Sequence, residues 1–138
     1  MEPEGTTSTS PLLFAGQVAI VTGGADGLGK AIVAMLVVNG ASVAIFDVAE
    51  QRMLEYARAL QSQGHRVEGF KVDISQEESV RKGFEAFRKE FARLDIMVNC
   101  AGVVGPNGVK TTEISVEDFD RVFAGGFKVL IATEQEYK

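Results

Sequence analysis

Several features that would place this chain in a particular class are missing from its sequence. Its only cysteine is Cys100, which excludes an intrachain disulfide bond. The longest apolar run, 31-AIVAMLVV-38, is much shorter than the roughly 20 residues that cross a bilayer. The net charge of −5 argues against nucleic-acid binding, which needs a basic surface. We therefore expect a protein that binds neither membranes nor nucleic acids.

The N-terminus shows no sign of a targeting segment. Residues 1–14 contain Glu2 and Glu4 but no basic residue, whereas a secretory signal begins with positive charge and an organellar transit peptide is rich in arginine. Their mixture of acid, Gly, Thr, Ser and Pro predicts a disordered lead-in. Residues 15–138 are then expected to form one domain, and the protein is expected to be cytoplasmic.

Beyond this lead-in, short apolar runs alternate with helical patterns. Strands are predicted at 17–21, 42–46, 67–72 and 94–98, and helices at 28–39, 50–62, 76–91 and after Ser115. The first, second and fourth strands are nearly continuous apolar runs, which is typical of strands buried on both faces. The alternating order predicts an α/β fold with a doubly wound parallel sheet. Strands one to three should lie on one side, with strand four on the other side of strand one.

Local signals refine the third and fourth predicted helices. The segment 75-SQEE-78 predicts a capping box at the start of the third helix, and 115-SVED-118 predicts a weaker box with Asp in place of Glu. Gly83 lies inside the third helix, where glycine costs about 1 kcal/mol relative to alanine. We therefore expect packing to require or tolerate that glycine.

The segment 20-IVTGGADGLGKA-31 places four glycines between the first strand and the first helix. Backbone N–H groups and the positive end of the helix dipole make such a turn an anion site. One interpretation is a mononucleotide P-loop, because Gly24, Gly29 and Lys30 match G-x-x-x-x-G-K. However, Ala31 lacks the hydroxyl that would hold magnesium, and Asp26 would put a carboxylate into the phosphate cradle.

The second interpretation is a dinucleotide-binding loop. Thr22, Gly23, Gly27 and Gly29 form the pattern T-G-x-x-x-G-x-G, and Asp47 follows at the end of the second strand. A dinucleotide fold has an acidic residue about 20 positions after its glycines, where the carboxylate accepts hydrogen bonds from ribose hydroxyls. A tight turn and a helix cap would also explain these residues, but their joint register favours nucleotide binding.

The chain resembles the N-terminal, cofactor-binding half of a short-chain dehydrogenase/reductase, over about residues 15–124. The glycine loop matches that family's TGxxxGxG, Asp73 matches its adenine-contacting Asp, and 99-NCAG-102 resembles its NNAG element. Residues 116–123 resemble the start of its long interface helix. The resemblance implies a Rossmann-type fold, a small alcohol or carbonyl substrate, and a homo-oligomer paired through the helix after Ser115. It implies no metal, and the following cofactor-binding residues: Thr22, Gly23, Asp26, Gly27, Leu28, Gly29, Asp47, Asp73, Ile74, Asn99, Ala101 and Gly102.

Charge favours NAD over NADP as the cofactor. NADP-preferring members of the family carry a basic residue beside the second loop glycine or after the second strand, whereas this chain has Asp26 and Asp47 there. A carboxylate about 4 Å from a phosphate charge costs roughly 1 kcal/mol in water and about 4 kcal/mol near a protein surface. Arg52 is the only nearby cation that could reduce this repulsion.

The family's catalytic residues have no counterpart in this sequence. A Tyr with a Lys four residues later would share one helical face, but Tyr56 is followed at that spacing by Leu60, and Tyr137 is next to Lys138. Gly126 stands where the interface helix would carry an Asn, and the likeness weakens after residue 124. We therefore expect either the cofactor-binding half of an NAD-dependent oxidoreductase or a non-catalytic short form that binds NAD or pairs with another subunit.

Overall fold

The computed structural model describes residues 11–102, 111–113, 115–118 and 120. Four strands and three helices alternate along the first range: β1 (Val18–Thr22), α1 (Gly27–Val38), β2 (Ser42–Asp47), α2 (Glu50–Ser62), β3 (Val67–Lys71), α3 (Glu77–Glu90) and β4 (Ile96–Asn99). A short 3₁₀ turn, η1, follows at Thr111–Glu113. The sequence predicted these seven helices and strands to within two residues at every boundary.

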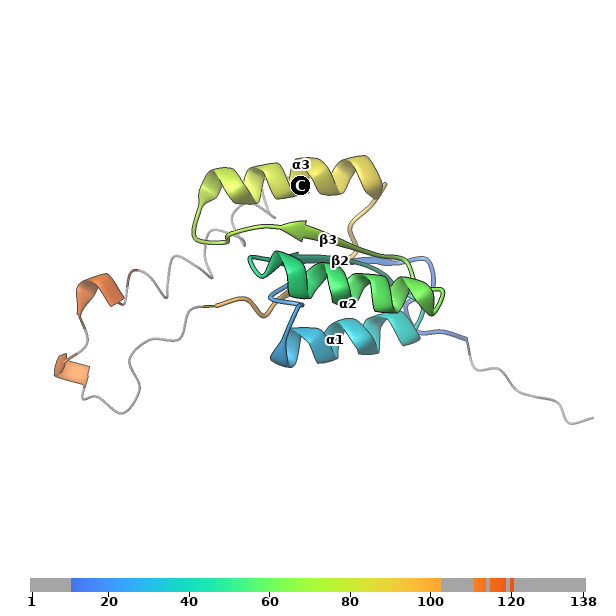
Figure 1. Cartoon of the computed structure of the whole chain (residues 1–138), viewed down its shortest axis with the longest axis horizontal. Helices are drawn as coiled ribbons and strands as arrows, with labels where there is room; N and C mark the ends of the chain where they lie inside the picture. The colour runs from blue at the N-terminus through green and yellow to red at the C-terminus, as the bar shows by residue number, and fades with distance from the viewer. Residues whose placement is uncertain (1–10, 103–110, 114, 119, 121–138) are drawn as a thin grey trace, which may run out of the picture.

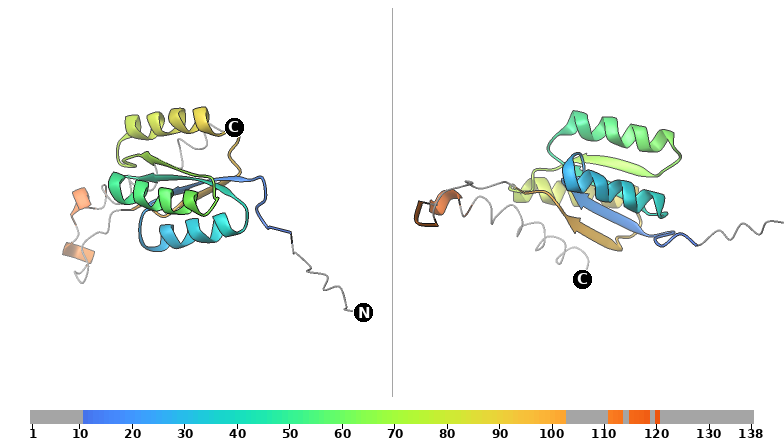
Figure 2. Two further views of the ribbon diagram at one scale, coloured as in Figure 1. Left: turned by 45° about the vertical axis from the view of Figure 1, so that its right-hand side comes forward. Right: turned by 90° about the horizontal axis from the view of Figure 1, so that it is seen from below.

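The strands form one parallel sheet in the order β3-β2-β1-β4. Figure 1 shows α3 on one face of this sheet and α1 and α2 on the other, and Figure 2 shows β4 beside β1. The predicted doubly wound α/β arrangement is therefore confirmed, including the position of β4 on the far side of β1. Because the strands are parallel, Thr22, Phe46 and Asn99 lie in register at the carboxyl ends of their strands, which we call the carboxyl edge of the sheet.

Two apolar clusters, one on each face, hold the helices to the sheet. On the first face Val33, Leu36 and Met53 pack against Val43 and Ile45. On the second face α3 contributes the stripe that its sequence predicted, which consists of Val80, Phe84, Phe87 and, at the C-cap, Phe91. The β1 residues are all buried, as predicted, but β4 is only partly buried because it lies at the edge of the sheet.

The N-terminal boundary of the packed region lies before β1. Phe14 packs against the first cluster, and its N–H donates to the carbonyl of Asn39 (2.8 Å). Within the predicted lead-in of residues 1–14, residues 1–10 lie outside the described part of the chain. The helical residues 116–118 follow Ser115, whose hydroxyl accepts from the N–H of Asp118 (3.0 Å).

The capping box expected at 75-SQEE-78 is wrong. The hydroxyl of Ser75 donates to the carboxylate of Asp73 (2.7 Å). The helix instead begins at Glu77, after Gln76, whose side chain makes no capping hydrogen bond. The N-cap of α3 is therefore Gln76 and not Ser75, whose hydroxyl is part of a local contact with Asp73.

Asp95 fixes the start of β4 through its backbone and its side chain. Its N–H donates to the carbonyl of Val18 (2.9 Å). One carboxylate oxygen accepts from the N–H of Val18 (2.8 Å), and Arg93 pairs with the other oxygen. The Arg93 guanidinium and, after it, the Val18 N–H lower the pKa of Asp95. This contact aligns the beginning of β4 with the beginning of β1.

Gly83 generates a testable prediction, because a methyl group at its position would lie 2.6 Å from Cγ2 of Val72 and 3.4 Å from the ring of Phe46. Both neighbours are buried and cannot move freely. We predict that Gly83→Ala lowers the free energy of unfolding by about 1–2 kcal/mol through overpacking, although alanine has the better helix propensity by about 1 kcal/mol.

Urea unfolding followed by circular dichroism measures this effect. The matched control is Lys82→Ala at the neighbouring exposed position, which should change stability by about 0.5 kcal/mol or less. A Gly83→Ala variant more stable than the parent chain would contradict this account of the packing.

Candidate site at the carboxyl edge of the sheet

A pocket of about 320 Å³ lies where the strands end. Parallel α/β sheets bind ligands at this edge, where the strand order reverses direction. Its lining combines the loop after β1, the ends of β2 and β3 and the segment after β4: Gly23, Phe46, Asp47, Val48, Val72, Asp73, Ile74, Ser75, Cys100, Ala101 and Gly102. The structure therefore brings together predicted residues from four separate segments.

The loop after β1 passes very close to its neighbours. Gly23 has φ +67°, and a Cβ there would lie 2.7 Å from the backbone nitrogen of Ala101. A Cβ on Gly29 would lie 2.1 Å from the carbonyl oxygen of Gly23. Only glycine fits both positions, so the spacing in the motif follows from the close packing of helix, loop and β4.

The first turn of α1 presents backbone donors toward the same edge. Asp26 is the N-cap residue, and its carboxylate accepts from the N–H of Gly27 (2.9 Å). The N–H groups of Leu28 and Gly29 belong to the same turn and have no acceptor within the helix. Gly27 itself has φ +54° and open space where a Cβ would stand. An anion could therefore approach this turn closely.

Asp47 links the loop to the second helix. One carboxylate oxygen accepts from the N–H of Ala25 (3.0 Å) and the other from the N–H of Ala49 (2.9 Å). A carboxylate has about four acceptor positions, so two remain for a ligand hydroxyl. The side chain thus has a structural role, but as a link between two loops rather than as the helix cap considered from the sequence, because the N-cap of α2 is Ala49, which makes no side-chain capping hydrogen bond.

Asp73 is held by residues that follow it in the chain. Its carboxylate accepts from both the hydroxyl (2.7 Å) and the N–H (3.0 Å) of Ser75, which lower its pKa. Its own N–H donates to the hydroxyl of Ser79 (2.8 Å). The adjacent Ile74 is 8% exposed and provides an apolar part of the pocket wall. The pocket therefore has a charged group and an apolar surface side by side.

Thr22 is the buried polar residue that joins β1 to the 99-NCAG-102 segment. Its hydroxyl accepts from the N–H groups of Cys100 and Ala101 (3.2 Å each) and donates to the Asn99 side chain (3.4 Å). A hydroxyl has one donor and two acceptor positions, so every hydrogen-bonding position of the Thr22 hydroxyl is occupied. Its role here is to position Ala101 rather than to face the pocket.

The cations near the loop are engaged with other groups. The Nη1 atom of Arg52 lies 2.9 Å from the carboxylate of Asp26. The ammonium of Lys30 lies over the ring of Tyr56, 4.9 Å from its centroid. This position places Lys30 toward α2, which does not support the P-loop interpretation.

Sequence reasoning missed part of the pocket wall. Phe46, Val48, Val72, Ser75 and Cys100 line it, and Ser79 holds the backbone of Asp73. The apolar residues were recognised only as core or strand residues, and nothing in their local pattern distinguishes a pocket wall from a core. Ser75 carried a usable signal, since a serine two positions after an aspartate commonly forms a local turn.

Within the described ranges, no helix has the length and hydropathy needed to span a membrane. Across those same residues, no three His, Cys, Asp or Glu side chains are grouped so as to hold a metal ion. The groups that the site offers to a ligand are backbone N–H donors, carboxylates and an apolar wall.

This arrangement defines a Rossmann-type α/β domain. The sequence model of the short chain dehydrogenase family matches residues 17–137, so the chain belongs to the short-chain dehydrogenase/reductase family of oxidoreductases. It is 42% identical over 93 residues to cis-4-hydroxycyclohexanecarboxylate dehydrogenase of Sinomonas cyclohexanicum, covering 67% of this chain and 37% of that protein. The chain spans less than half the length of that relative.

Solved structures agree with this assignment. The structure of gox2181 superimposes with a TM-score of 0.82 at 30% identity, covering 91% of this chain and 50% of the other. A short-chain dehydrogenase/reductase from Burkholderia phymatum, solved in complex with NAD, gives a TM-score of 0.79 at 26% identity, covering 88% of this chain and 44% of the other.

The Thr22 contacts generate a second prediction. Thr22→Val preserves the shape of this buried side chain but removes the acceptor for the partly buried N–H of Ala101, and leaving a buried donor unsatisfied costs about 1–3 kcal/mol. We predict a loss of stability of that size in urea unfolding. Thr22→Ser retains the hydroxyl and should be less destabilised than the valine variant. Equal stability of the valine variant and the parent chain would show that this contact contributes little.

Proposed function

We propose that this chain binds NAD at the carboxyl edge of its sheet, as the cofactor-binding part of an NAD-dependent oxidoreductase. The observation that carries the proposal is the Asp47 carboxylate, held by two backbone N–H groups beside the glycine loop with acceptor positions to spare. The bound cofactor would exchange a hydride between its nicotinamide and an alcohol or carbonyl carbon. The residues of this chain would hold and orient it.

The pocket residues fit the parts of a dinucleotide. The first turn of α1 offers N–H groups and a partial positive charge for the pyrophosphate. Asp47 would accept the adenosine ribose hydroxyls. Val48, Val72 and Ile74 offer apolar surface for the adenine, and Asp73 lies beside them. The segment formed by Asn99, Ala101 and Gly102 would border the remainder of the cofactor.

The preference for NAD follows from charge. The additional phosphate of NADP sits on the same adenosine ribose, so it would lie against Asp47 and near Asp26. Repulsion of about 1–4 kcal/mol from Asp47, the carboxylate nearest to that phosphate, corresponds to a factor of five or more in affinity. Direct repulsion by Asp26 is smaller, because its side chain is 74% exposed and screened by water. The pairing of Arg52 with Asp26 offsets part of one of these charges.

A second candidate is a non-catalytic form that binds NAD without turning over substrate. It is favoured by the absence of a Tyr with a Lys four residues later in the 138-residue sequence. A positioned general acid contributes about 10²–10⁴-fold to such a rate. Steady turnover of secondary alcohols by the pure chain would favour the first candidate, and binding without turnover would favour the second. Pairing of subunits through the helix after Ser115 remains a further hypothesis.

The Asp47 side chain provides the test of cofactor binding. We predict that the chain binds NADH more tightly than NADPH in a fluorescence titration. Asp47→Asn should reduce that preference by about tenfold, because it removes a charge that opposes the 2′-phosphate. The amide oxygen can keep only one of the two backbone hydrogen bonds of Asp47, so circular dichroism must first show that the variant is folded.

Glu85→Gln is the control, since it removes one charge from the exposed surface of α3 and should leave the preference unchanged. Equal affinity of the parent chain for the two nucleotides would contradict the proposed selection of NAD.

A further inference from the structure

An exposed ion pair joins the two helices that flank the proposed ribose position. Nη1 of Arg52, in the first turn of α2, lies 2.9 Å from a carboxylate oxygen of Asp26, the N-cap of α1. The two side chains are 61% and 74% exposed. Ion pairs this exposed are weak and exchange readily with other partners.

Backbone contacts place this pair next to Asp47. Ala25, which precedes Asp26, donates to one oxygen of the Asp47 carboxylate. Ala49, the residue before α2, donates to the other oxygen. The Arg52–Asp26 pair therefore spans the two segments that Asp47 joins. A surface hollow at the start of α2, lined by Ala49, Glu50, Gln51, Arg52 and Glu55, adjoins the arginine.

We propose that Arg52 is a latent ligand for the 2′-phosphate of NADP and that Asp26 disfavours NADP chiefly by holding Arg52 away from it. The proposal rests on the proposed function, because it assumes that a nicotinamide dinucleotide binds with its adenosine ribose at Asp47. A guanidinium binds phosphate through two parallel N–H donors, so a released Arg52 has a strong alternative partner. Asp26 is then a specificity-determining residue that acts through Arg52.

An alternative model, in which Asp26 only repels the 2′-phosphate of NADP, predicts a different result. If the carboxylate only repels the phosphate, its removal should help NADPH binding equally whether or not Arg52 is present. If it restrains Arg52, most of the gain should disappear when Arg52 is absent. A double-mutant cycle separates the two, because it measures the coupling between the residues directly.

The variants are Asp26→Asn, Arg52→Ala and the double variant, prepared in the full 138-residue chain. Asparagine is as good an N-cap as aspartate, so Asp26→Asn should retain the start of α1 while losing the charge. Circular dichroism and thermal unfolding verify that each variant is folded. Dissociation constants for NADH and NADPH are then measured by nicotinamide fluorescence at fixed ionic strength, since exposed charges are screened by salt.

With Arg52 present, Asp26→Asn should raise the affinity for NADPH by about tenfold. In the Arg52→Ala background the same change should raise it by about threefold or less, the part due to repulsion alone. Arg52→Ala by itself should have little effect, and the affinity for NADH should change by less than about threefold throughout. Equal effects of Asp26→Asn in both backgrounds would overturn the inference.

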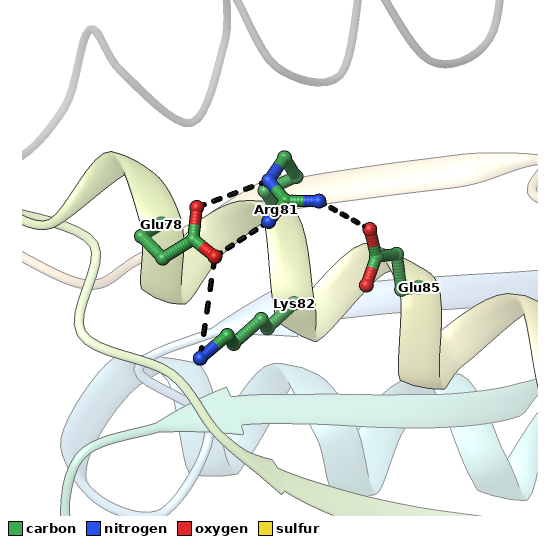
Figure 3. Close-up of polar contacts among 4 residues, drawn as sticks. All are labelled: Glu78, Arg81, Lys82 and Glu85. Carbon is green, nitrogen blue, oxygen red and sulfur yellow. Dashed lines mark hydrogen bonds and ion pairs between the residues drawn. The ribbon is translucent and has the colours of Figure 1, made fainter.

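A matched control exists on the opposite face of the sheet. Glu78→Gln also removes one exposed carboxylate that pairs with an arginine, Arg81 on α3, although Arg81 keeps Glu85 as a second partner (Figure 3). It should change neither nucleotide's affinity, and a gain for NADPH equal to that of Asp26→Asn would mean that net charge alone sets the preference. Failure of the folded parent chain to bind either nucleotide would overturn the proposed function and the inference together.

Discussion

The close approach of Gly29 to the carbonyl of Gly23 is the constraint on which the site depends. The gap leaves no room for a side chain, because a Cβ on Gly29 would stand 2.1 Å from that oxygen. This contact fixes the start of α1 against the end of β1 and so sets where the first N–H groups of the helix point. Gly23 is constrained in turn by Ala101, which Thr22 holds through its hydroxyl. The loop, the helix and β4 are thus positioned by one continuous set of short contacts.

Much of this fold could be predicted from sequence because its signals are local or strictly periodic. Three of the four strands are continuous apolar runs, and α3 carries its aromatic stripe at helical spacing. The errors occurred where a local signal did not fix the boundary of an element. Ser75 has the pattern of a helix cap, but α3 begins one residue later, after Gln76. The apolar pattern of β4 also did not predict its partial exposure. That exposure arises because β4 is the outermost strand, and the order of the strands is not encoded in the pattern of any one of them.

The candidate site was only partly predictable, and for a different reason. The glycines and acids form a recognisable spacing, but the bonds that make them useful connect distant segments. The hydrogen bond between Asp47 and Ala25 joins residues 22 positions apart in the sequence, and the one between Thr22 and Ala101 joins residues 79 positions apart. The sequence also could not show that Asp47 has structural partners of its own. The same two contacts fix the Asp47 carboxylate in the wall of the pocket.

The central claim, that the carboxyl edge of this sheet holds NAD, is tested most directly by mapping NAD binding on the amide resonances of the ¹⁵N-labelled chain. The account predicts that the shifts concentrate on Gly23, Gly27, Asp47 and Ile74, the residues around the pocket and the first turn of α1. The amides of Arg81 and Glu85, on the far face of the sheet, should be unaffected. Shifts spread evenly over the molecule, or none at millimolar NAD with the chain folded, would contradict it.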